Sequence, residues 1–151
     1  MSPEGTATAQ ADVLSELREL RGRVKHVEGS VVATTDGMVI AHDLGASEAI
    51  AVEPEGVAAL SAVNLGLSQR ITDTASHGEL QVSIIRGAFG HVLTYAAGDR
   101  ALLTVLVRAE CELESLQADA RQVADRVAEL LADTWQDDAA TWEARPSTGT
   151  P

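Results

Sequence analysis

Hydrophobic positions follow the period of a helix at the start of the chain and that of a strand soon afterwards. A stripe at spacings of three and four predicts an amphipathic helix, and it consists of Leu14, Leu17, Leu20, Val24 and Val27. Two runs of β-forming residues, 30–34 and 38–41, then flank Thr35-Asp36-Gly37. This pattern predicts a β-hairpin, because glycine readily adopts the positive φ that such a turn requires.

The pattern then alternates once more between helix and strand. After a loop over residues 42–53, Pro54 suits the first turn of a helix. The elements expected from there are a helix over 54–76, strands over 80–86, 88–97 and 101–107, and a helix over 112–134. Short turns join consecutive strands, so these are expected to be antiparallel, and three amphipathic helices suffice to cover both faces of a sheet. The sequence therefore predicts an α/β sandwich with the order α-β-β-α-β-β-β-α.

One folded domain is expected between two unstructured ends. Residues 1–10 are small and polar without a period, which predicts a disordered arm. Residues 135–151 are acidic and then rich in Pro, Ser, Thr and Gly, which predicts a flexible tail. The domain itself is expected over residues 11–134, and a length of 151 residues is typical of a single domain.

The helix expected over residues 54–76 carries two apolar faces rather than one. At about 100° per residue, one side holds the larger residues Leu60, Val63, Leu67 and Ile71. The other side holds Ala58, Ala59, Ala62, Leu65, Gly66 and Gln69. Because a helix of a monomeric domain needs one apolar face, we interpret the small-residue side as a surface for close contact with a second copy of the chain. The alternative is that alanine is simply a good helix former in an alanine-rich chain.

Basic residues are concentrated at one place, the outward positions of the first helix. They are Arg18, Arg21, Arg23 and Lys25. One interpretation is a solvated helix face that Glu16 and Glu19 balance in part. The other interpretation is a docking patch for an acidic partner.

The charge balance narrows the classes of partner. The chain has 11 basic and 23 acidic residues, a formal net charge of −12. Phosphate backbones and anionic lipid repel such a chain, so nucleic-acid binding is not expected. No apolar run approaches the ~18 residues that span a bilayer, and no signal-peptide pattern is present, so a cytoplasmic protein is expected. A single lysine and abundant alanine are typical of a high-GC bacterial genome.

Residues able to carry chemistry are few and scattered. A lone cysteine, Cys111, excludes an internal disulfide and a cysteine-cluster metal site, and it favours a reducing compartment. Cys111 is expected to be buried or inert, since the carboxylates of Glu112 and Glu114 raise the pKa of a nearby thiol. The four histidines lack the spacing of a zinc site. Aromatic residues make up only 3% of the chain, too few to hold a stacked cofactor, so neither cofactor nor metal is expected.

Sequence motifs of catalysis are also missing. The chain contains no phosphate-binding loop, no dinucleotide-binding glycine motif and no nucleophile elbow. His42-Asp43 would be the candidate acid–base pair, but a polar strand end explains these two residues more simply. We therefore expect no enzyme and assign no catalytic residue.

Residues 27–41, VEGSVVATTDGMVIA, resemble the opening signature of the roadblock/dynein-light-chain family. That signature is Val-x-Gly, a β-rich stretch, an Asp-Gly or Glu-Gly turn and a second strand. The resemblance continues through the alanine-rich helix, the three strands and the closing helix, and so covers residues 12–134. It implies a profilin-like, three-layer sandwich in which a five-stranded antiparallel sheet carries the middle helix on one face and the terminal helices on the other.

The resemblance also implies how two chains pair. Family members dimerise through the middle helix and the edge of the following strand, so that one sheet runs across the two-fold axis. The matching positions in this sequence are Ala58, Ala62, Leu65, Gly66, Gln69, Leu80, Val82 and Ile84.

Members of this family regulate or scaffold small Ras-like GTPases, so the resemblance implies a homodimer that binds such a GTPase. Arg70, Arg86 and Arg108 would be candidates for an arginine that acts on the phosphates in trans; because bacterial relatives remodel the GTPase instead, none is assigned. The alternatives are a sensory module that binds a small ligand in an enclosed pocket, an enzyme based on His42 and Asp43, and a structural subunit of an assembly.

Overall fold

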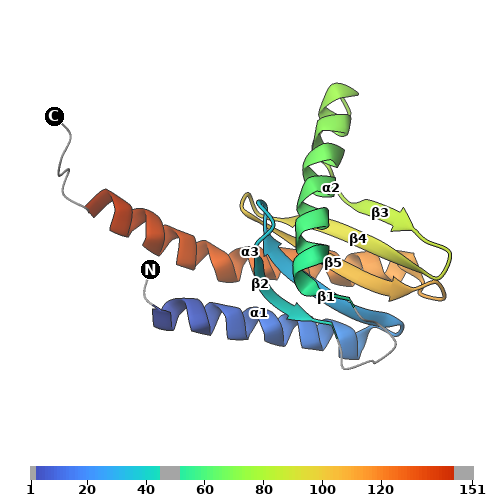
Figure 1. Cartoon of the computed structure of the whole chain (residues 1–151), viewed down its shortest axis with the longest axis horizontal. Helices are drawn as coiled ribbons and strands as arrows, with labels where there is room; N and C mark the ends of the chain where they lie inside the picture. The colour runs from blue at the N-terminus through green and yellow to red at the C-terminus, as the bar shows by residue number, and fades with distance from the viewer. Residues whose placement is uncertain (1–2, 45–51, 145–151) are drawn as a thin grey trace.

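One antiparallel sheet of five strands, in the order β2-β1-β5-β4-β3, separates the helices into two layers (Figure 1). The computed structural model describes residues 3–44 and 52–144, and side chains within residues 5–44 and 52–135. Its elements are α1 (Pro3–Arg23), β1 (Val27–Thr34), β2 (Val39–Asp43), α2 (Pro54–Thr74), β3 (Ser83–Arg86), β4 (Gly90–Ala97), β5 (Ala101–Arg108) and α3 (Leu113–Ala144). The element order and the antiparallel pairing confirm the fold predicted from the sequence.

The helices cover the two faces of the sheet unequally. α1 and α3 lie against one face, and α2 crosses the other face alone (Figure 1). The larger core lies under α1 and α3, and its fully buried side chains include Val13, Leu17, Leu20, Leu93, Leu103, Val105 and Leu116. A smaller cluster lies under α2. β5 is buried on both faces, which explains why its sequence is apolar almost throughout.

The β1–β2 hairpin forms where the Asp-Gly pair predicted it. Gly37 has a φ of +93°, and the backbone N–H of Thr34 donates to the carbonyl of Met38 at 2.8 Å. A Cβ on Gly37 would lie 3.2 Å from the Cα of Ala59 in α2. Glycine is therefore required here both by the turn and by the close approach of α2.

Both terminal helices extend further than the sequence pattern suggested. α1 begins at Pro3, so the disordered arm predicted for residues 1–10 is wrong over residues 3–10. Ala9 continues the buried stripe of α1 and packs into the larger core. α3 continues to Ala144, past the predicted end of the domain, and Trp135 packs against the same core. Packing between distant segments stabilises these turns, and such packing is not visible in a local sequence window.

α1 ends earlier than the predicted helical stripe does. His26 adopts a left-handed φ of +73°, and Val27 already belongs to β1. Val24 and Val27 nevertheless pack into the larger core, so the apolar spacing persists through the change in backbone. Most of the predicted loop that follows β2, residues 45–51, lies outside the described residues.

Candidate protein-interaction face

α2 meets the sheet through the small residues Ala58 and Ser61 and through Leu65. Ala58 and Leu65 are buried within one chain, in a cluster with Val31, Ala33 and Leu102. This side was interpreted as a surface for a second chain, but the sheet of the same chain already covers Ala58 and Leu65. Small side chains let the helix approach the sheet closely, and periodicity alone does not tell which of two apolar faces does so.

The larger residues of α2 are left in solvent. Leu60, Val63, Leu67 and Ile71 are 73%, 69%, 58% and 59% exposed. We call these four residues the α2 stripe. Their spacing of three and four places them along one side of the helix, where they form a contiguous apolar patch of the kind that marks an interaction surface on a soluble protein.

The C-terminal half of α2 has little of its own chain beneath it. The buried residues of this helix are Ala58, Ser61 and Leu65, and none follows Leu65. Figure 1 shows that the last turns of α2 extend beyond the strands. Leu67 and Ile71 follow the last buried residue of the helix, and the described residues leave both exposed.

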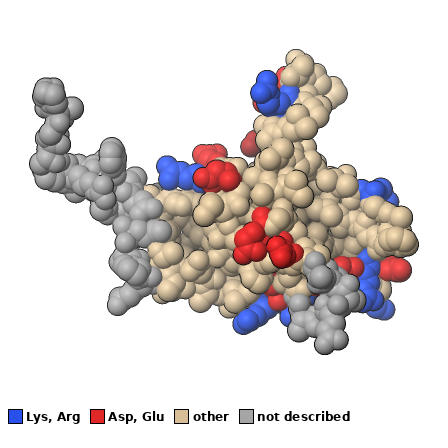
Figure 2. Space-filling model, in the orientation of Figure 1, with Lys and Arg blue, Asp and Glu red and all other residues tan. Residues whose placement is uncertain are grey.

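β3 supplies a second uncovered feature beside α2. It is an edge strand that pairs with β4, and on its other side it has no strand partner within the described residues. Ile84 is 37% exposed and Ile85 is 50% exposed. A groove of about 220 Å³ runs between α2 and this edge, and it is lined by Val57, Leu60, Ser61, Asn64, Ile85, Val92, Thr94 and Leu106. We call the stripe, the groove and the strand edge together the α2–β3 face (Figure 2).

Side chains of two helices hold the connection between α2 and β3 in place. Gln69 Oε1 accepts a hydrogen bond from the backbone N–H of Leu80 at 3.1 Å. Asn64 Nδ2 donates to Ser83 Oγ at 2.8 Å. From α3, Arg121 donates to a backbone carbonyl of the same connection. Gln69 was predicted as a contact residue of a dimer, and the structure gives it the role of tying the edge strand to its own helix.

The remaining predicted contact residues lie in different environments. Ala62 packs partly buried beside the cluster under α2, and Gly66 is exposed on the flank of α2 away from the stripe. Leu80 and Val82 precede β3, which is shorter than predicted, and they pack toward the two different clusters. Ile84 lies in β3 itself, at the strand edge of the α2–β3 face, with its side chain on the opposite side of the sheet from that of Ile85.

Two of the four residues of the predicted basic patch form ion pairs within the chain. Arg21 Nε lies 2.7 Å from Oδ2 of the buried Asp43, and Arg23 lies 3.6 Å from Asp119. The carboxylates that pair with these arginines come from Asp43 and Asp119 rather than from the predicted Glu16 and Glu19. The other two members of the patch, both exposed, are Arg18 and Lys25.

In the described structure, residues that could act in catalysis or bind a metal do not lie together. Asp43 faces Arg21, and His42 is exposed, so the candidate acid–base pair is not assembled. Within the residues that the structure describes, no group of three His, Cys, Asp or Glu side chains is placed to hold a metal ion. The helices of the same residues include none that is long and apolar enough to cross a membrane.

Two buried groups have raised pKa values. Burial, with the carboxylate of Glu112 nearby, raises the pKa of the Cys111 thiol, which keeps it protonated and weakly nucleophilic. Burial raises the pKa of Tyr95 to about 12, against an opposing effect of Arg121, whose guanidinium lies 5.0 Å from the ring centroid. Both groups stabilise the core as neutral side chains.

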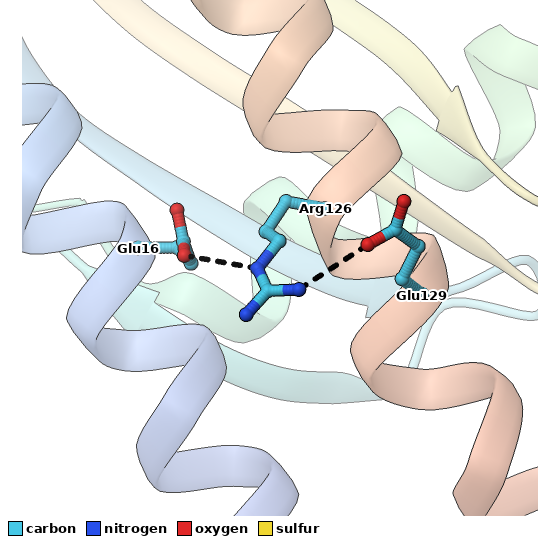
Figure 3. Close-up of polar contacts among 3 residues, drawn as sticks. All are labelled: Glu16, Arg126 and Glu129. Carbon is cyan, nitrogen blue, oxygen red and sulfur yellow. Dashed lines mark hydrogen bonds and ion pairs between the residues drawn. The ribbon is translucent and has the colours of Figure 1, made fainter.

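Other hollows of the described surface are grooves between elements. One of about 830 Å³ lies between α1 and α3, where Arg126 is 3.5 Å from Glu16 and 3.2 Å from Glu129 (Figure 3). Another, of about 530 Å³, lies beside Trp135. A third, of about 300 Å³, runs along the flank of α2 that carries Gly66. The enclosed pocket that a sensory module requires is not among them.

Comparison with known proteins agrees with this architecture. Residues 13–107 match the model of the Roadblock/LC7 domain. The uncharacterized protein MJ0310 of Methanocaldococcus jannaschii is 31% identical over 115 residues, which are 76% of this chain and 93% of that protein. MglB of Myxococcus xanthus superposes with a TM-score of 0.72 at 14% identity, over 82% of this chain and 90% of that one. A Roadblock/LC7 domain from Streptomyces avermitilis superposes with a TM-score of 0.70 at 18% identity, over 79% and 97%. At such identities the two structures show a shared fold.

Proposed function

This chain belongs to the Roadblock/LC7 domain family, and we propose that it is a non-enzymatic regulator or scaffold that forms a homodimer and binds a small Ras-like GTPase. The class of partner follows from the family resemblance, and the fold shared with MglB supports it. The observation that carries the proposal is the α2–β3 face, an apolar surface that a single chain leaves uncovered.

A second copy of the chain is the occupant that best fits the α2–β3 face. The face combines an unpaired strand edge with a helix that extends past the sheet. A two-fold axis beside β3 would place the β3 strands of both copies antiparallel and bring each α2 stripe toward the partner's sheet. Such pairing would satisfy the backbone groups of the edge and remove the stripe from water. The contact residues proposed on this basis are Leu60, Val63, Leu67, Ile71, Ile84 and Ile85.

Among the described residues, no charged side chain that would oppose self-association lines the groove of the α2–β3 face. Each chain carries a formal net charge of −12, so two copies repel one another at long range. The groove of the α2–β3 face is lined by aliphatic and uncharged polar side chains. Contact through this surface therefore brings no carboxylates of the groove together, and the apolar burial acts against the general repulsion.

In this proposal the dimer holds the GTPase and supplies no catalytic residue to it. Arg70, Arg86 and Arg108 are exposed, and we assign a catalytic role to none of them. Regulation would then work through differential binding: a dimer that binds one nucleotide state of the GTPase more tightly shifts its population toward that state.

Two measurements test the proposal. Sedimentation velocity of the full chain is expected to give a mass near twice 15.8 kDa. The Ras-like GTPases of the same cell, each purified and loaded with GDP or with a non-hydrolysable GTP analogue, are then assayed for binding. At least one is expected to bind, with different affinities in the two nucleotide states. A monomer at micromolar concentration would overturn the homodimer, and a lack of binding to every one of these GTPases would overturn the partner.

A further inference from the structure

A second groove runs along the flank of α2 that faces away from the stripe. Its volume is about 300 Å³. Ala62 and Gly66 of α2 and Ala96 of β4 give it an apolar wall, and the acidic residues Glu79 and Asp99 line it as well. The first of these acids lies in the connection after α2, and the second lies in the turn between β4 and β5.

The two acidic residues of this groove have no cationic partner. Neither Glu79 nor Asp99 forms an ion pair in the described part of the chain, and no Lys or Arg is among the residues that line the groove. Arg100, the next residue after Asp99, lines the neighbouring groove beside Trp135 together with Asp99, and its guanidinium lies 5.8 Å from the ring centroid of Trp135. Figure 2 shows acidic side chains beside α2, with a basic group next to those on the left. The groove thus combines an apolar wall with two carboxylates that form no ion pair in the described part of the chain.

We propose that this groove accepts a long cationic side chain, arginine or lysine, that a protein partner presents. Such a side chain has an apolar stem and a charged head, so the stem would pack on Ala62, Gly66 and Ala96 and the head would lie near Glu79 and Asp99. Ligand pockets have volumes of about 300–1,000 Å³, and a groove at the lower end of that range suits one side chain rather than a cofactor. Arginine fits better than lysine, because its planar guanidinium can donate two parallel hydrogen bonds to a carboxylate.

Gly66 keeps the groove open. A Cβ built on Gly66 meets no atom within 4 Å, so any side chain there would stand in the free space of the groove. Glycine within a helix costs about 1 kcal/mol relative to alanine, and nothing in the packing of this chain requires it at this position. We infer that a glycine is present at this position because it leaves the groove accessible.

In the proposed dimer, a second chain on the α2–β3 face would leave this groove accessible. It shares no lining residue with the groove beside β3, and helical geometry directs Gly66 and Leu67 to different flanks of α2. The inference deepens the proposed function, and it rests on that function only in assigning the cation to a protein partner. The groove itself can be tested with neither GTPase nor dimer present.

The test uses N-acetyl-argininamide as the probe and its neutral isostere N-acetyl-citrullinamide as the control. In the isotope-labelled full chain, the amide resonances of Gly66, Gly98 and Asp99 report on the groove. The arginine derivative is expected to shift them saturably, with an affinity about tenfold higher than that of the citrulline derivative, and added salt should weaken the binding. Equal shifts with both compounds, or shifts only at acidic residues outside the groove, would overturn the inference.

A first pair of variants tests the shape of the groove. Gly66→Leu fills it and is expected to weaken binding of the arginine derivative about tenfold. Gly56→Leu is the matched control, at another exposed glycine of α2 whose Cβ also meets no atom within 4 Å. It should bind like the unaltered chain. Equal affinities for the two variants would place the cation elsewhere.

A second pair tests the charge. Glu79→Gln combined with Asp99→Asn keeps the shape of both side chains and removes their charge, and this double variant should also lose about tenfold in affinity. Glu110→Gln combined with Glu114→Gln makes the same change at exposed carboxylates outside the groove and should have little effect. All these sites are on the surface, so the variants are expected to fold. An unchanged affinity in the groove variant would overturn the inference, whereas failure to bind any GTPase would affect only the proposed function.

Discussion

Replacing Leu67 with arginine is expected to separate the homodimer while the single chain stays folded. Leu67 is 58% exposed in one chain, so the substitution is a surface change there and should alter the free energy of unfolding by no more than about 0.5 kcal/mol. In the proposed dimer the same side chain lies in the contact. An arginine at that place would bring an unpaired charge into an apolar surface.

The size of the effect follows from the exposed fraction. Complete burial of a leucine side chain stabilises by about 1.5–3 kcal/mol, and 58% of Leu67 remains to be covered. Covering it contributes about 1–2 kcal/mol per chain, and two-fold symmetry doubles this to about 2–4 kcal/mol per dimer. Leu67→Ala, which removes most of this contribution, should raise the dissociation constant of the dimer roughly 30- to 1,000-fold. Leu67→Arg should raise it further.

Sedimentation velocity over a series of concentrations measures the dissociation constant, and thermal unfolding of the same samples checks the fold. Gly66→Arg is the matched control: it is the neighbouring residue, takes the same new side chain and lies on another flank of α2. The sequence pattern assigned Gly66 to the dimer contact, whereas the structure supports Leu67. A dimer that survives Leu67→Arg and dissociates with Gly66→Arg would refute our reasoning from the structure.

Three further changes examine the structure around the face. Gln69→Ala removes the hydrogen bond to the Leu80 N–H and is expected to lower the free energy of unfolding by about 0.5–1.5 kcal/mol; amide hydrogen exchange at Leu80 should become faster, and unchanged exchange would show that Gln69 does not hold this connection. Arg21→Ala leaves the buried carboxylate of Asp43 without its partner at 2.7 Å, so chemical denaturation should show a loss of about 1–3 kcal/mol, and an unshifted midpoint would contradict the role of this pair. Burial raises the pKa of Tyr95, the single tyrosine, from 10.0 to about 12, so its contribution to stability is complete below pH 10 and is lost as the pH rises toward 12; phenolate absorbance measures this titration, and ionisation near pH 10 in the folded chain would be the contrary result.

Local patterns in the sequence were enough to predict the order of the elements. The turn at Gly37 depends on one glycine with positive φ, and the run from Ala101 to Val107 is apolar because that strand is buried on both faces. The ends of the helices were harder to predict. α1 begins at Pro3 because Ala9 packs into a core whose other members are distant in sequence, and helix propensity over a short window does not include that contribution.

The sequence predicted which elements form the interaction face, but it did not predict which of their residues do. The pattern identified two apolar sides of α2, but it did not tell which one meets the sheet. Ala58 and Leu65 are buried, and Leu60 and Leu67 are exposed. The alanines Ala58 and Ala62 were the signal that could have distinguished the two sides, since a helix that lies close to a sheet needs small residues at the point of closest approach; Leu65, which is as large as Leu67, is buried on the same side.

Helices, strands and the β1–β2 turn could be read from the chain because backbone hydrogen bonding and turn chemistry act over a few neighbouring residues. The exposed stripe of α2, the ion pair of Arg21 with Asp43 and the open groove at Gly66 required the three-dimensional packing. Each of these depends on distances between segments far apart in the sequence, and a pattern of apolar and polar positions contains no information about such distances.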